Sequence, residues 1–495
     1  MFDELVAVAD SARGAGAVGG WARVENAACA RRLAAMADLL DARLAADGSA
    51  EREQWCLDNW DAVSAEIGAA MNVSAGVASH QLLIAQALRD RLPRVAEVFS
   101  AGAISYRLVD TIVGRTRLIQ DPEALAKIDA ELAAHAAGWG ALSAAKTETA
   151  IDYWVDRYDP QALRRTESRS RGRHLDVSAD PDGAGTASVS GQLFGHHGAA
   201  LTQRLDAMAH TVCEHDPRTI DQRRSDAMGA LGLGADRLAC ECGREDCPAA
   251  TAQPPSAVVV HVIAEQQSLT DDTPAHLDGP TPSPEPPTEP APTNPAAVIG
   301  GPILPTPLLA AKLAGTATIR QLIHPGDSPP EPRYRPSRAL ADFVHCRDMT
   351  CRFPGCDEPA YRCDLDHTIA YPHGPTCASN IKCLCRKHHL LKTFWGWLDR
   401  QLPDGTVIWT SPSGQTYTTK PGSVILFPSL CRPTAPIVTS TDTSAAAAST
   451  ATQPGRDLAM PRRKTTRTQN RHRAIETERQ LNNAYIAERN KPPPF

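Results

Sequence analysis

The sequence lacks the features that would place the chain in a membrane or on a secretory route. Its longest apolar stretches, such as Ala257–Ile263, fall far short of the roughly 20 residues that a membrane span needs. Its first residues carry acidic side chains where a secretory leader has a basic and then an apolar segment. We therefore expect a cytoplasmic protein that does not contact a membrane.

Aromatic residues are also scarce, at 5% of 495 residues, whereas the chain contains 40 prolines and 33 glycines. This composition indicates that part of the chain stays outside any packed core. The length suits two or three domains of the usual size of about 100 to 200 residues, which excludes a peptide or a disulfide-stapled miniprotein. We expect folded domains that are separated by disordered connections.

The net charge is −6, an average that argues at first against a polyanionic partner. The distribution is uneven, however. Residues 333–400 contain 11 Lys and Arg against 7 Asp and Glu, and residues 461–495 contain 9 against 3. The second segment has the composition of a nonspecific nucleic-acid-binding arm, with an unbound, solvated tail as the alternative.

The apolar periodicity predicts an α+β multidomain protein that begins with a helical domain over residues 1–165. One helical stripe comprises Leu33, Met36, Leu40 and Leu44, and a second helix starts with Asp121 as N-cap and Pro122 at its first position. Three further helical patterns fit a helix-turn-helix DNA reader, but such spacing is common in all-helical bundles, which we favour. They are Ser74–Leu92, Pro93–Ala101 and Ile104–Leu118.

The rest of the chain is predicted to divide into five parts. They are a small α+β region continuing the N-terminal domain (166–267), a Pro-rich disordered linker (268–300), a connecting helix (301–333), a cysteine-rich domain (334–422) and a low-complexity basic tail (432–495). The linker assignment depends on nine prolines in residues 271–300, which prevent a packed core. Within the α+β region we expect strands over Ala184–Leu193 and Ser256–Glu265 and a helix over Ala199–Cys213.

A small group of thiols lies in this α+β region. Cys240, Cys242 and Cys247 are spaced as C-x-C-x4-C, and Cys213 or His215 could supply a fourth zinc ligand. The alternative is a loop with unpaired thiols.

A larger group follows: eight of the 14 cysteines fall between Cys346 and Cys431. In a reducing cytosol such crowding indicates a metal site more often than a disulfide framework. Zinc prefers four soft or borderline ligands in a tetrahedron, and we expect a structural zinc on Cys351, Cys356, Cys385 and His388. On a helix, Cys385 and His388 share a face, whereas His389 is turned by about 100° from His388. The thiols that compete with this set are Cys346, Cys363, Cys377 and Cys383.

A second set of residues is interleaved with these cysteines: Asp366-His367, then Asn380, then His389. In order and spacing they resemble the HNH endonuclease motif, the ββα-metal finger, in which Asp-His ends a strand, Asn lies in a loop and a histidine sits on a helix. The chain also resembles the actinobacterial repeat family that joins an N-terminal helical domain of unknown function to a C-terminal HNH domain. That likeness is carried by the segments 350–356, 391–397 and 490–495.

The resemblance implies distinct roles for these residues. His367 would be the general base, because an imidazole titrates near neutrality. Asp366 and His389 would bind a catalytic divalent ion, for which Mg²⁺ or Mn²⁺ is favoured and Zn²⁺ or Ni²⁺ is the alternative. Asn380 would support the base or the loop by hydrogen bonding. Asp366 and His367 can serve one phosphate only if their strand ends or bends there, since successive strand residues project to opposite faces.

Three basic residues near His389 are candidates for phosphate contacts. Arg386 and Lys392 are each three residues from His389 on the expected helix, and Lys387 is a weaker candidate. A solvated basic helix face is the alternative for each. Beyond this helix we expect short strands over Trp395–Leu398, Val407–Trp409 and Thr416–Thr419, with Trp395, Trp397 and Trp409 in their core.

These patterns predict a metal-dependent HNH endonuclease that hydrolyses phosphodiester bonds in DNA, or alternatively in RNA. A second hypothesis is a zinc-stabilised nucleic-acid-binding protein without turnover, because the presence of the motif residues does not ensure a catalytically competent site. A third is a structural zinc domain for protein contacts, which would show no salt-dependent affinity for DNA. We expect no small-molecule substrate, and the sequence does not determine the oligomeric state.

Overall fold

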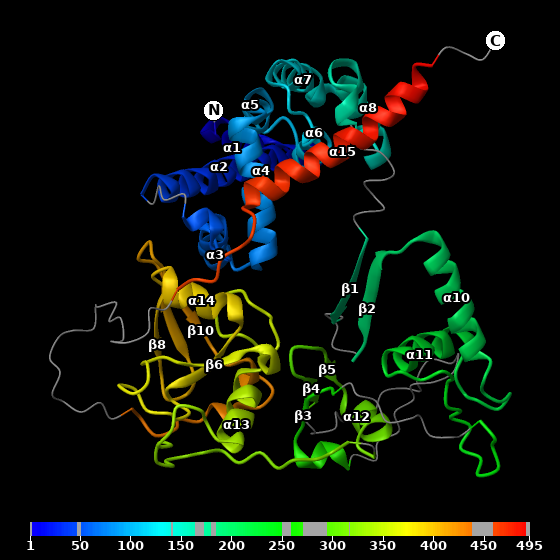
Figure 1. Ribbon diagram of the computed structural model, residues 1–495, viewed down its shortest axis with the longest axis vertical. Helices are drawn as coiled ribbons and strands as arrows, with labels where there is room; N and C mark the ends of the chain where they lie inside the picture. The colour runs from blue at the N-terminus through cyan, green and yellow to red at the C-terminus, as the bar shows by residue number, and fades with distance from the viewer. Residues whose placement is uncertain are drawn as a thin grey trace.

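The computed structural model describes residues 2–46, 51–139, 142–163, 173–179, 185–249, 259–270, 295–315, 317–437 and 459–491. It shows a helical lobe formed by the N-terminal residues, a C-terminal module with small sheets, and a third part formed by the residues between them (Figure 1). This confirms a mainly helical N-terminal region in a mixed α and β chain. Within the described ranges, no helix combines the length and the apolar character needed to cross a membrane.

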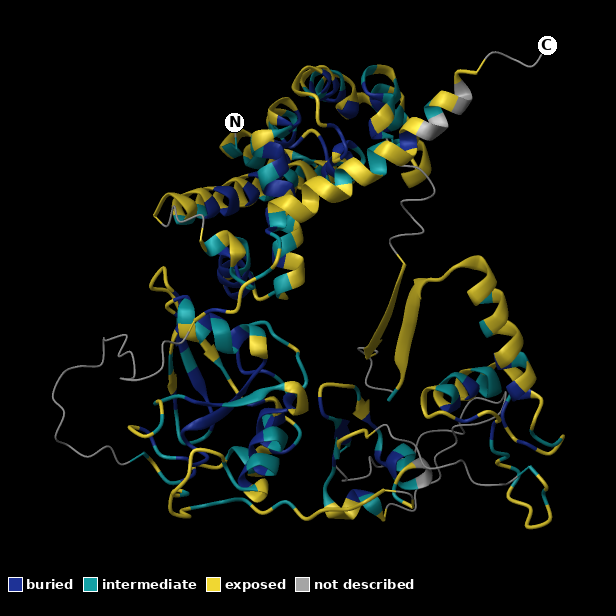
Figure 2. Cartoon of the chain, viewed as in Figure 1, coloured by how far each residue is buried: buried dark blue, intermediate teal, exposed yellow. Residues whose placement is uncertain are grey.

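The described helical lobe is built from α1 (Phe2–Ser11), α2 (Ala15–Ala46), α3 (Asn59–Met71), α4 (Ala75–Asp90), α5 (Pro93–Ser100), α6 (Tyr106–Thr116), α7 (Pro122–His135) and α8 (Ala144–Tyr158). Side-chain caps start several of these helices: Ser74 accepts a hydrogen bond from Val77 N, and Asp121 accepts one from Ala124 N. The buried faces of the helices form a common apolar core (Figure 2). An all-helical bundle is therefore the correct description of this lobe.

The middle part of the chain contains β1 (His174–Ala179), β2 (Ala187–Gln192), α10 (Gly195–Ala209), α11 (Ile220–Gly232), β3 (Val262–Ile263), β4 (Ala296–Val298), β5 (Ile303–Leu304) and α12 (Thr306–Lys312). β1 and β2 form an antiparallel hairpin that is exposed along its length (Figure 2). β3, β4 and β5 form an antiparallel sheet in that order.

Two expectations for this part are wrong. The linker predicted over 268–300 contains β4, and the connecting helix predicted over 301–333 is reduced to the seven residues of α12. Pro325, Pro329 and Pro330 exclude a helix interior only over the last part of this range, and α12 already ends at Lys312. Most of the Pro-rich segment, residues 271–294, lies outside the described residues.

The C-terminal module contains α13 (Arg338–Asp348), β6 (Asp364–His367), β7 (Ile381–Leu384), α14 (Arg386–Phe394), β8 (Leu398–Gln401), β9 (Val407–Thr410) and β10 (Thr416–Thr419). β6 pairs with β7, and β8 to β10 form an antiparallel sheet in the order β10-β9-β8. The strand predicted over Trp395–Leu398 begins only at Leu398, because Gly396 turns the chain with a φ of 74°. Trp395, Trp397 and Trp409 are buried, as expected.

The helical lobe and the C-terminal module share one apolar core. Ala62 and Ala65 of α3 lie in the same buried cluster as Phe353 and Trp397 of the module. Trp395 Nε1 also donates a hydrogen bond to the backbone oxygen of Leu57, just before α3, at 3.2 Å. The module therefore packs directly against the lobe.

The C-terminal tail, predicted to be low-complexity and disordered apart from a short helix over Ala474–Asn490, contains a longer ordered helix. Its described residues, 459–491, contain α15 (Arg467–Arg489), a 23-residue helix that runs along the helical lobe (Figure 1). Asn482 Nδ2 donates to the backbone oxygens of Gln161 and Leu163, at 2.7 Å each, and so fixes the helix on the lobe. The low-complexity stretch, residues 438–458, lies outside the described residues.

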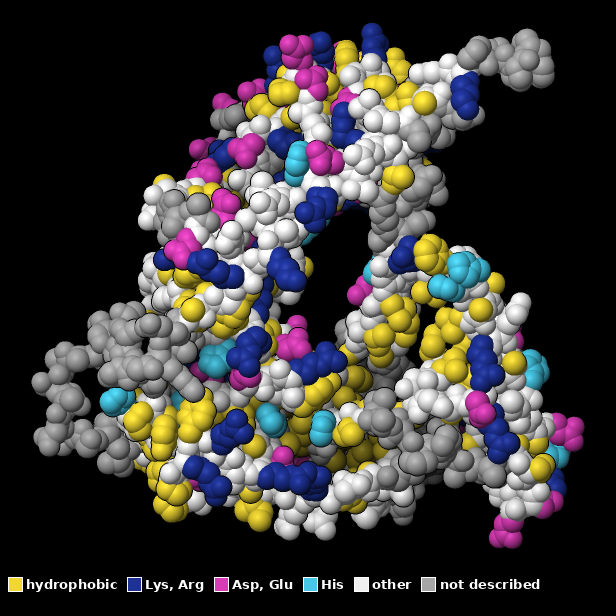
Figure 3. All heavy atoms as spheres, viewed as in Figure 1, with side chains coloured by type: hydrophobic (Ala, Val, Ile, Leu, Met, Phe, Trp, Pro, Cys, Tyr) yellow, Lys and Arg dark blue, Asp and Glu magenta, His cyan; other side chains and the backbone are white. Residues whose placement is uncertain are grey.

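Acidic residues of the lobe neutralise the tail arginines that were expected to contact nucleic acid. Arg463 donates to Asp58 Oδ2 at 3.0 Å and to Asp61 Oδ2 at 2.7 Å, and Arg467 donates to the same oxygens at 3.1 and 2.9 Å. Burial raises the pKa of Asp58, but the hydrogen bond and charge of Arg467 outweigh it and lower that pKa. On the surface of the helical lobe in Figure 3, Lys and Arg side chains are mixed with those of Asp and Glu. A free nucleic-acid-binding arm is therefore wrong for these two arginines.

Reversing both charges is expected to release α15 from the lobe. In the variant Arg463→Glu/Arg467→Glu, breaking these partly buried pairs and placing like charges beside Asp58 and Asp61 should cost roughly 2 kcal/mol. Amide hydrogen exchange in α15 should then become at least about 30-fold faster, since 1.36 kcal/mol corresponds to a factor of ten. Arg473→Glu, at an exposed position of the same helix, is the matched control. Equal protection of α15 in both variants would contradict this docking.

Candidate functional site

A hairpin followed by a helix brings the expected site residues together. β6 and β7 pair antiparallel, with Asp366 opposite Lys382 and His367 opposite Ile381. Cys385 follows β7 directly and is the N-cap of α14, which packs against both strands. The local order is therefore strand, strand, helix, as the sequence predicts.

Cys351, Cys356, Cys385 and His388 converge on one point. Their three sulfurs and one imidazole nitrogen all lie within 4.8 Å of one another. His388 Nδ1 is 3.2 Å from Cys385 Sγ and 3.5 Å from Cys351 Sγ. Ligands about 2.0–2.3 Å from a tetrahedral zinc lie roughly 3.3–3.8 Å apart. This group, which we call the knuckle cluster, could therefore hold a zinc ion.

The thiols of the knuckle cluster differ in how readily they ionise. Burial raises the pKa of Cys351, and hydrogen bonds with Cys351 and Cys385 raise the pKa of Cys356. Hydrogen bonds with Cys351 and Cys356, followed by that of His388, instead lower the pKa of Cys385. Cys385 is thus the first of the three to become a thiolate, which is the form that binds a metal. The His388 ring stacks on Phe353 with centroids 4.0 Å apart, which fixes its orientation.

The competing thiols lie outside the knuckle cluster, although the Cys363 thiol still interacts with that of Cys351. Cys383 Sγ is directed at the backbone oxygen of Val344, 3.9 Å away, and Cys363 Sγ at that of Pro359, 3.5 Å away. Among the described residues, neither belongs to the converged ligands, and the same holds for Cys346 and Cys377.

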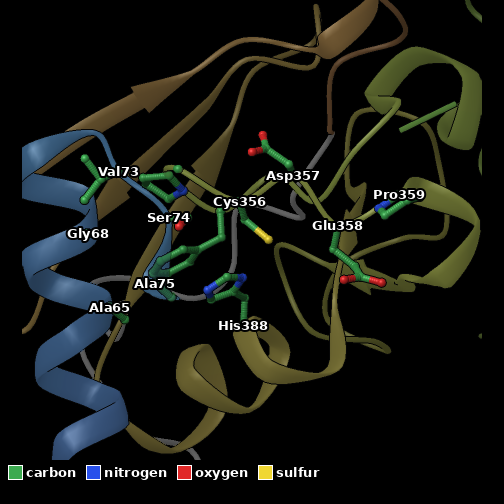
Figure 4. A pocket seen from close by; sticks show the side chains of 13 residues that line it. Ala65, Gly68, Val73, Ser74, Ala75, Cys356, Asp357, Glu358, Pro359 and His388 are labelled. Carbon is green, nitrogen blue, oxygen red and sulfur yellow. The ribbon is translucent and has the colours of Figure 1, made fainter. Parts of the chain in front are cut away.

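A cavity of about 360 Å³ opens beside the knuckle cluster, where the lobe meets the module (Figure 4). Cys356 and His388 line it from the module, and Ser74 lines it from the lobe. Gly355 has a φ of 69°, and a Cβ there would stand 2.7 Å from the backbone oxygen of Val73. Glycine is therefore required for this close approach, which ties the cluster to the lobe.

Asp366 and His389 form a second meeting point, turned by about 100° around α14 from His388. His389 Nε2 lies 3.4 Å from Asp366 Oδ1, and His389 Nδ1 lies 3.0 Å from Asp364 Oδ2. A carboxylate that accepts a hydrogen bond from one imidazole nitrogen leaves the other nitrogen available to a metal. Asp364 was not predicted as a site residue. Its signal was its position two residues before Asp366, which puts both carboxylates on one face of the strand.

Two cations, one buried and one partly buried, hold the other oxygen of Asp366. Lys382 Nζ and Lys392 Nζ each donate to Oδ2 at 2.7 Å, and both lysines also pair with Asp399. Burial alone would raise the pKa of Asp366, but these two ammonium groups lower it, so the carboxylate stays ionised. Burial and the charge of Lys382 together lower the pKa of Lys392. Oδ1 is the oxygen of Asp366 that faces His389.

His367 leaves β6 on the face opposite Asp366. Thr368 and Asp366 both bind Lys382 Nζ, so the strand alternation continues through His367. The bend that would turn both side chains to one side is therefore absent, although β6 does end at His367.

The His367 ring is held by its own set of contacts. It stacks on Tyr334 with centroids 5.3 Å apart, and Nε2 lies 2.9 Å from Thr376 Oγ1. When the Thr376 hydroxyl donates to the backbone oxygen of Tyr334, 3.4 Å away, it accepts from His367 Nε2, and this tautomer leaves Nδ1 basic. Burial lowers the pKa of His367, which favours the neutral imidazole.

Asn380 braces the loop that follows β6. Its Oδ1 accepts from Ile369 N at 2.8 Å, and its Nδ2 donates to the backbone oxygens of Ile369 at 3.0 Å and Pro375 at 2.8 Å. The side chain is fully buried. Of the two supporting roles expected for Asn380, these hydrogen bonds correspond to holding the loop.

The three expected phosphate contacts lie in different surroundings. Arg386 is 71% exposed and pairs with Asp364 at 3.0 Å. Lys387 is 34% exposed and lies 3.7 Å from Asp61 of α3. Lys392 is turned inward to the buried carboxylates of Asp366 and Asp399, whereas both the predicted phosphate contact and its alternative, a solvated helix face, need it to point outward. Its ammonium group lies beside Asp366 because a buried carboxylate is costly in free energy unless an opposite charge pairs with it.

Comparison with known proteins shows relatives along almost the whole chain. A family model described as "Domain of unknown function (DUF222)" matches residues 21–348. "Uncharacterized protein Rv2100" of Mycobacterium tuberculosis (strain ATCC 25618 / H37Rv) is 51% identical over 96% of this chain and 88% of its own length. "Uncharacterized protein Rv3776" of the same strain is 51% identical over 98% of this chain and 92% of its own length. No solved structure matches the fold. The family match ends before the knuckle cluster and the Asp366–His389 pair.

Proposed function

We propose, from the premise that this chain belongs to the DUF222 family, that its C-terminal module is a metal-dependent HNH endonuclease that cleaves DNA. The DUF222 family is found in actinobacterial HNH-associated proteins. A cytoplasmic location and a DNA partner are parts of this proposal. The single observation that carries it is the approach of His389 to Asp366 between α14 and β6.

The donor set at this approach suits a divalent ion. Two ligand atoms of one ion lie roughly 3 Å apart, and Asp366 Oδ1 and His389 Nε2 are separated by 3.4 Å. Asp364 holds His389 with Nε2 turned toward Asp366. One oxygen and one nitrogen ligand fit Mg²⁺ or Mn²⁺, with Zn²⁺ or Ni²⁺ as alternatives, and leave room for water and phosphate.

A divalent ion held by these residues would take up charge on the phosphate and lower the pKa of water. His367 would accept the proton of the attacking water at Nδ1, in the tautomer whose Nε2 donates to Thr376. In the described residues β6 pairs with β7 alone, so its other edge lies free of a strand partner. A phosphodiester that crosses this edge at the end of β6 would contact Asp366 on one face of the strand and His367 on the other.

Other residues would position the reacting groups. The knuckle cluster fixes His388, and because His389 is the next residue of α14, it also fixes the rotation of the helix that presents His389. Asn380 would be a positioning residue through the loop it braces. Arg386, whose charge is the most exposed of the three basic candidates, would contact a flanking phosphate.

Removing the Asp364 carboxylate is expected to weaken the site without emptying it. In Asp364→Ala, His389 loses the group that orients its imidazole, and such losses cost about 10- to 100-fold in metal affinity or activity. The Mg²⁺ concentration for half-maximal DNA cleavage should rise by that factor. Asp357→Ala removes an exposed carboxylate from the same module and serves as the control. An unchanged Mg²⁺ dependence in Asp364→Ala would contradict the orienting role.

Supercoiled plasmid tests the proposed activity. The zinc-loaded full chain should convert it to nicked or linear DNA when Mg²⁺ or Mn²⁺ is added. His367→Ala should leave the plasmid intact while still retarding its migration, because the general base is lost and the phosphate-binding surface is kept.

A DNA-binding protein without turnover is the second candidate. It is favoured by the two lysines on Asp366, which already balance the charge of that carboxylate. In this case wild type and His367→Ala both retard DNA in a salt-dependent way and both leave it uncut. If neither protein retards DNA, a zinc module for protein contacts is the remaining function.

A further inference from the structure

The helix pair formed by α10 and α11 has a very small apolar core. Its buried members are Leu205, Met208, Ala227, Ala230, Ala235 and Leu238. Half of these side chains are alanines, which bury little surface. Units with so small a core usually depend on disulfides or a bound metal for stability. A further source of stability is therefore expected close to these helices.

Four cysteines meet at the end of this helix pair. Cys213 follows α10, and Cys240, Cys242 and Cys247 follow α11. Their sulfurs all lie within 4.8 Å of one another, and the sulfurs of Cys213 and Cys240 are 3.5 Å apart. Thiolates about 2.3 Å from a tetrahedral zinc are separated by roughly 3.8 Å, whereas the sulfurs of a disulfide are about 2.05 Å apart. The separation matches zinc ligands, and His215, the other predicted ligand, lies outside the group.

A buried ion-pair network holds the cysteine-bearing segments in place. The side chains of Asp216 and Arg218 are 0% and 2% exposed and pair at 2.7 Å. Arg218 donates to the backbone oxygen of Ala239 at 2.7 Å, and Glu241 N donates to Asp216 Oδ2 at 3.0 Å. The loop after α10 thus fixes the backbone on both sides of Cys240. Such outer contacts orient the ligands of metal sites.

We propose that Cys213, Cys240, Cys242 and Cys247 form a second zinc site, which joins α10 to α11. Four thiolates complete the coordination of zinc, so this site stabilises the fold and offers no open position for catalysis. It lies inside the DUF222 match, apart from the knuckle cluster, and does not rest on the nuclease proposal.

Native mass spectrometry of the full chain, purified with zinc under reducing conditions, counts bound zinc ions and disulfides in one measurement. Wild type should carry two zinc ions. Cys242→Ser and Cys356→Ser should each carry one, and the double variant should carry none. Cys29→Ser, which lies outside both clusters, should keep two.

Two further measurements separate loss of this site from loss of the whole fold. Hydrogen exchange in Cys242→Ser should rise in α10 and α11 while α7 stays protected. The second measurement uses the unmutated protein loaded with cobalt. Its thiolate-to-cobalt absorption should correspond to seven thiolates per chain, against three if the knuckle cluster alone binds metal. One metal ion in wild type, two in Cys242→Ser, or disulfides among the four cysteines would overturn the proposal.

Discussion

Replacing Cys385 by serine is expected to remove zinc from the knuckle cluster and to unfold the C-terminal module. Cys385 has the thiol with the lowered pKa, and it belongs to the same buried cluster as Phe353, Trp397 and Trp409. Structural zinc contributes apparent binding free energies of about 10–16 kcal/mol, whereas whole domains are stable by only about 5–15 kcal/mol. Loss of this ion should therefore exceed the stability of the module.

The near-ultraviolet circular dichroism of the buried tryptophans, measured together with the zinc content, checks this prediction. We expect the tryptophan signal of the module to collapse in Cys385→Ser. Cys431→Ser is the control, because that thiol lies outside the cluster and contacts Ser423. A Cys385→Ser protein with wild-type zinc content and an unchanged thermal transition would show that this cysteine is not a ligand.

Replacing His389 by alanine is expected to abolish DNA cleavage while leaving the fold and the knuckle zinc intact. His389 is one of the two proposed protein ligands of the catalytic ion, and a metal ligand contributes several kcal/mol of transition-state stabilisation. The cleavage rate of supercoiled plasmid should fall at least about 100-fold. The side chain is 29% exposed, so its removal leaves no large cavity.

The neighbouring histidine provides the matched comparison. His388→Ala should lose zinc and unfold the module, because His388 is buried between Phe353 and the cluster thiols. His389→Ala should keep its zinc and its tryptophan signal. If His389→Ala cleaves DNA at the wild-type rate, or if both variants lose zinc equally, the two histidines do not serve different ions.

Residues whose partners are set by short spacing could be predicted from the sequence. Cys385 and His388 share a helix face, and the knuckle cluster is confirmed as a group that could hold a metal. The turn of about 100° between adjacent helix residues correctly separated His389 from His388. Capping residues such as Asp121 also gave the correct helix starts.

Contacts across elements could not be predicted in the same way. Lys382 and Lys392 pair with Asp366 because three further elements, β7, α14 and β8, bring charged side chains to it. In the sequence, a single lysine on a strand or helix predicts a solvated side chain. No local pattern therefore indicated this network of ion pairs. Asp364 was missed for a similar reason, since its partner His389 is 25 residues away.

The tail and the domain boundaries were misjudged because composition describes isolated segments. Composition does not show the partners that other parts of the chain supply, and Asp58 and Asp61 of the lobe bind Arg463 and Arg467. In the same way, residues 1–165 were predicted as one helical domain, yet Ala62 and Ala65 of α3 pack against the C-terminal module.

The most direct test of the central claim, that β6 and α14 hold the catalytic ion, is a titration of the zinc-loaded full chain with Mn²⁺. Bound Mn²⁺ is counted by electron paramagnetic resonance, and plasmid cleavage is measured in the same samples. We expect one Mn²⁺ to bind per chain, cleavage to rise with its occupancy, and both to disappear in His389→Ala. Mn²⁺ binding that survives in His389→Ala, or cleavage without bound Mn²⁺, would contradict the claim.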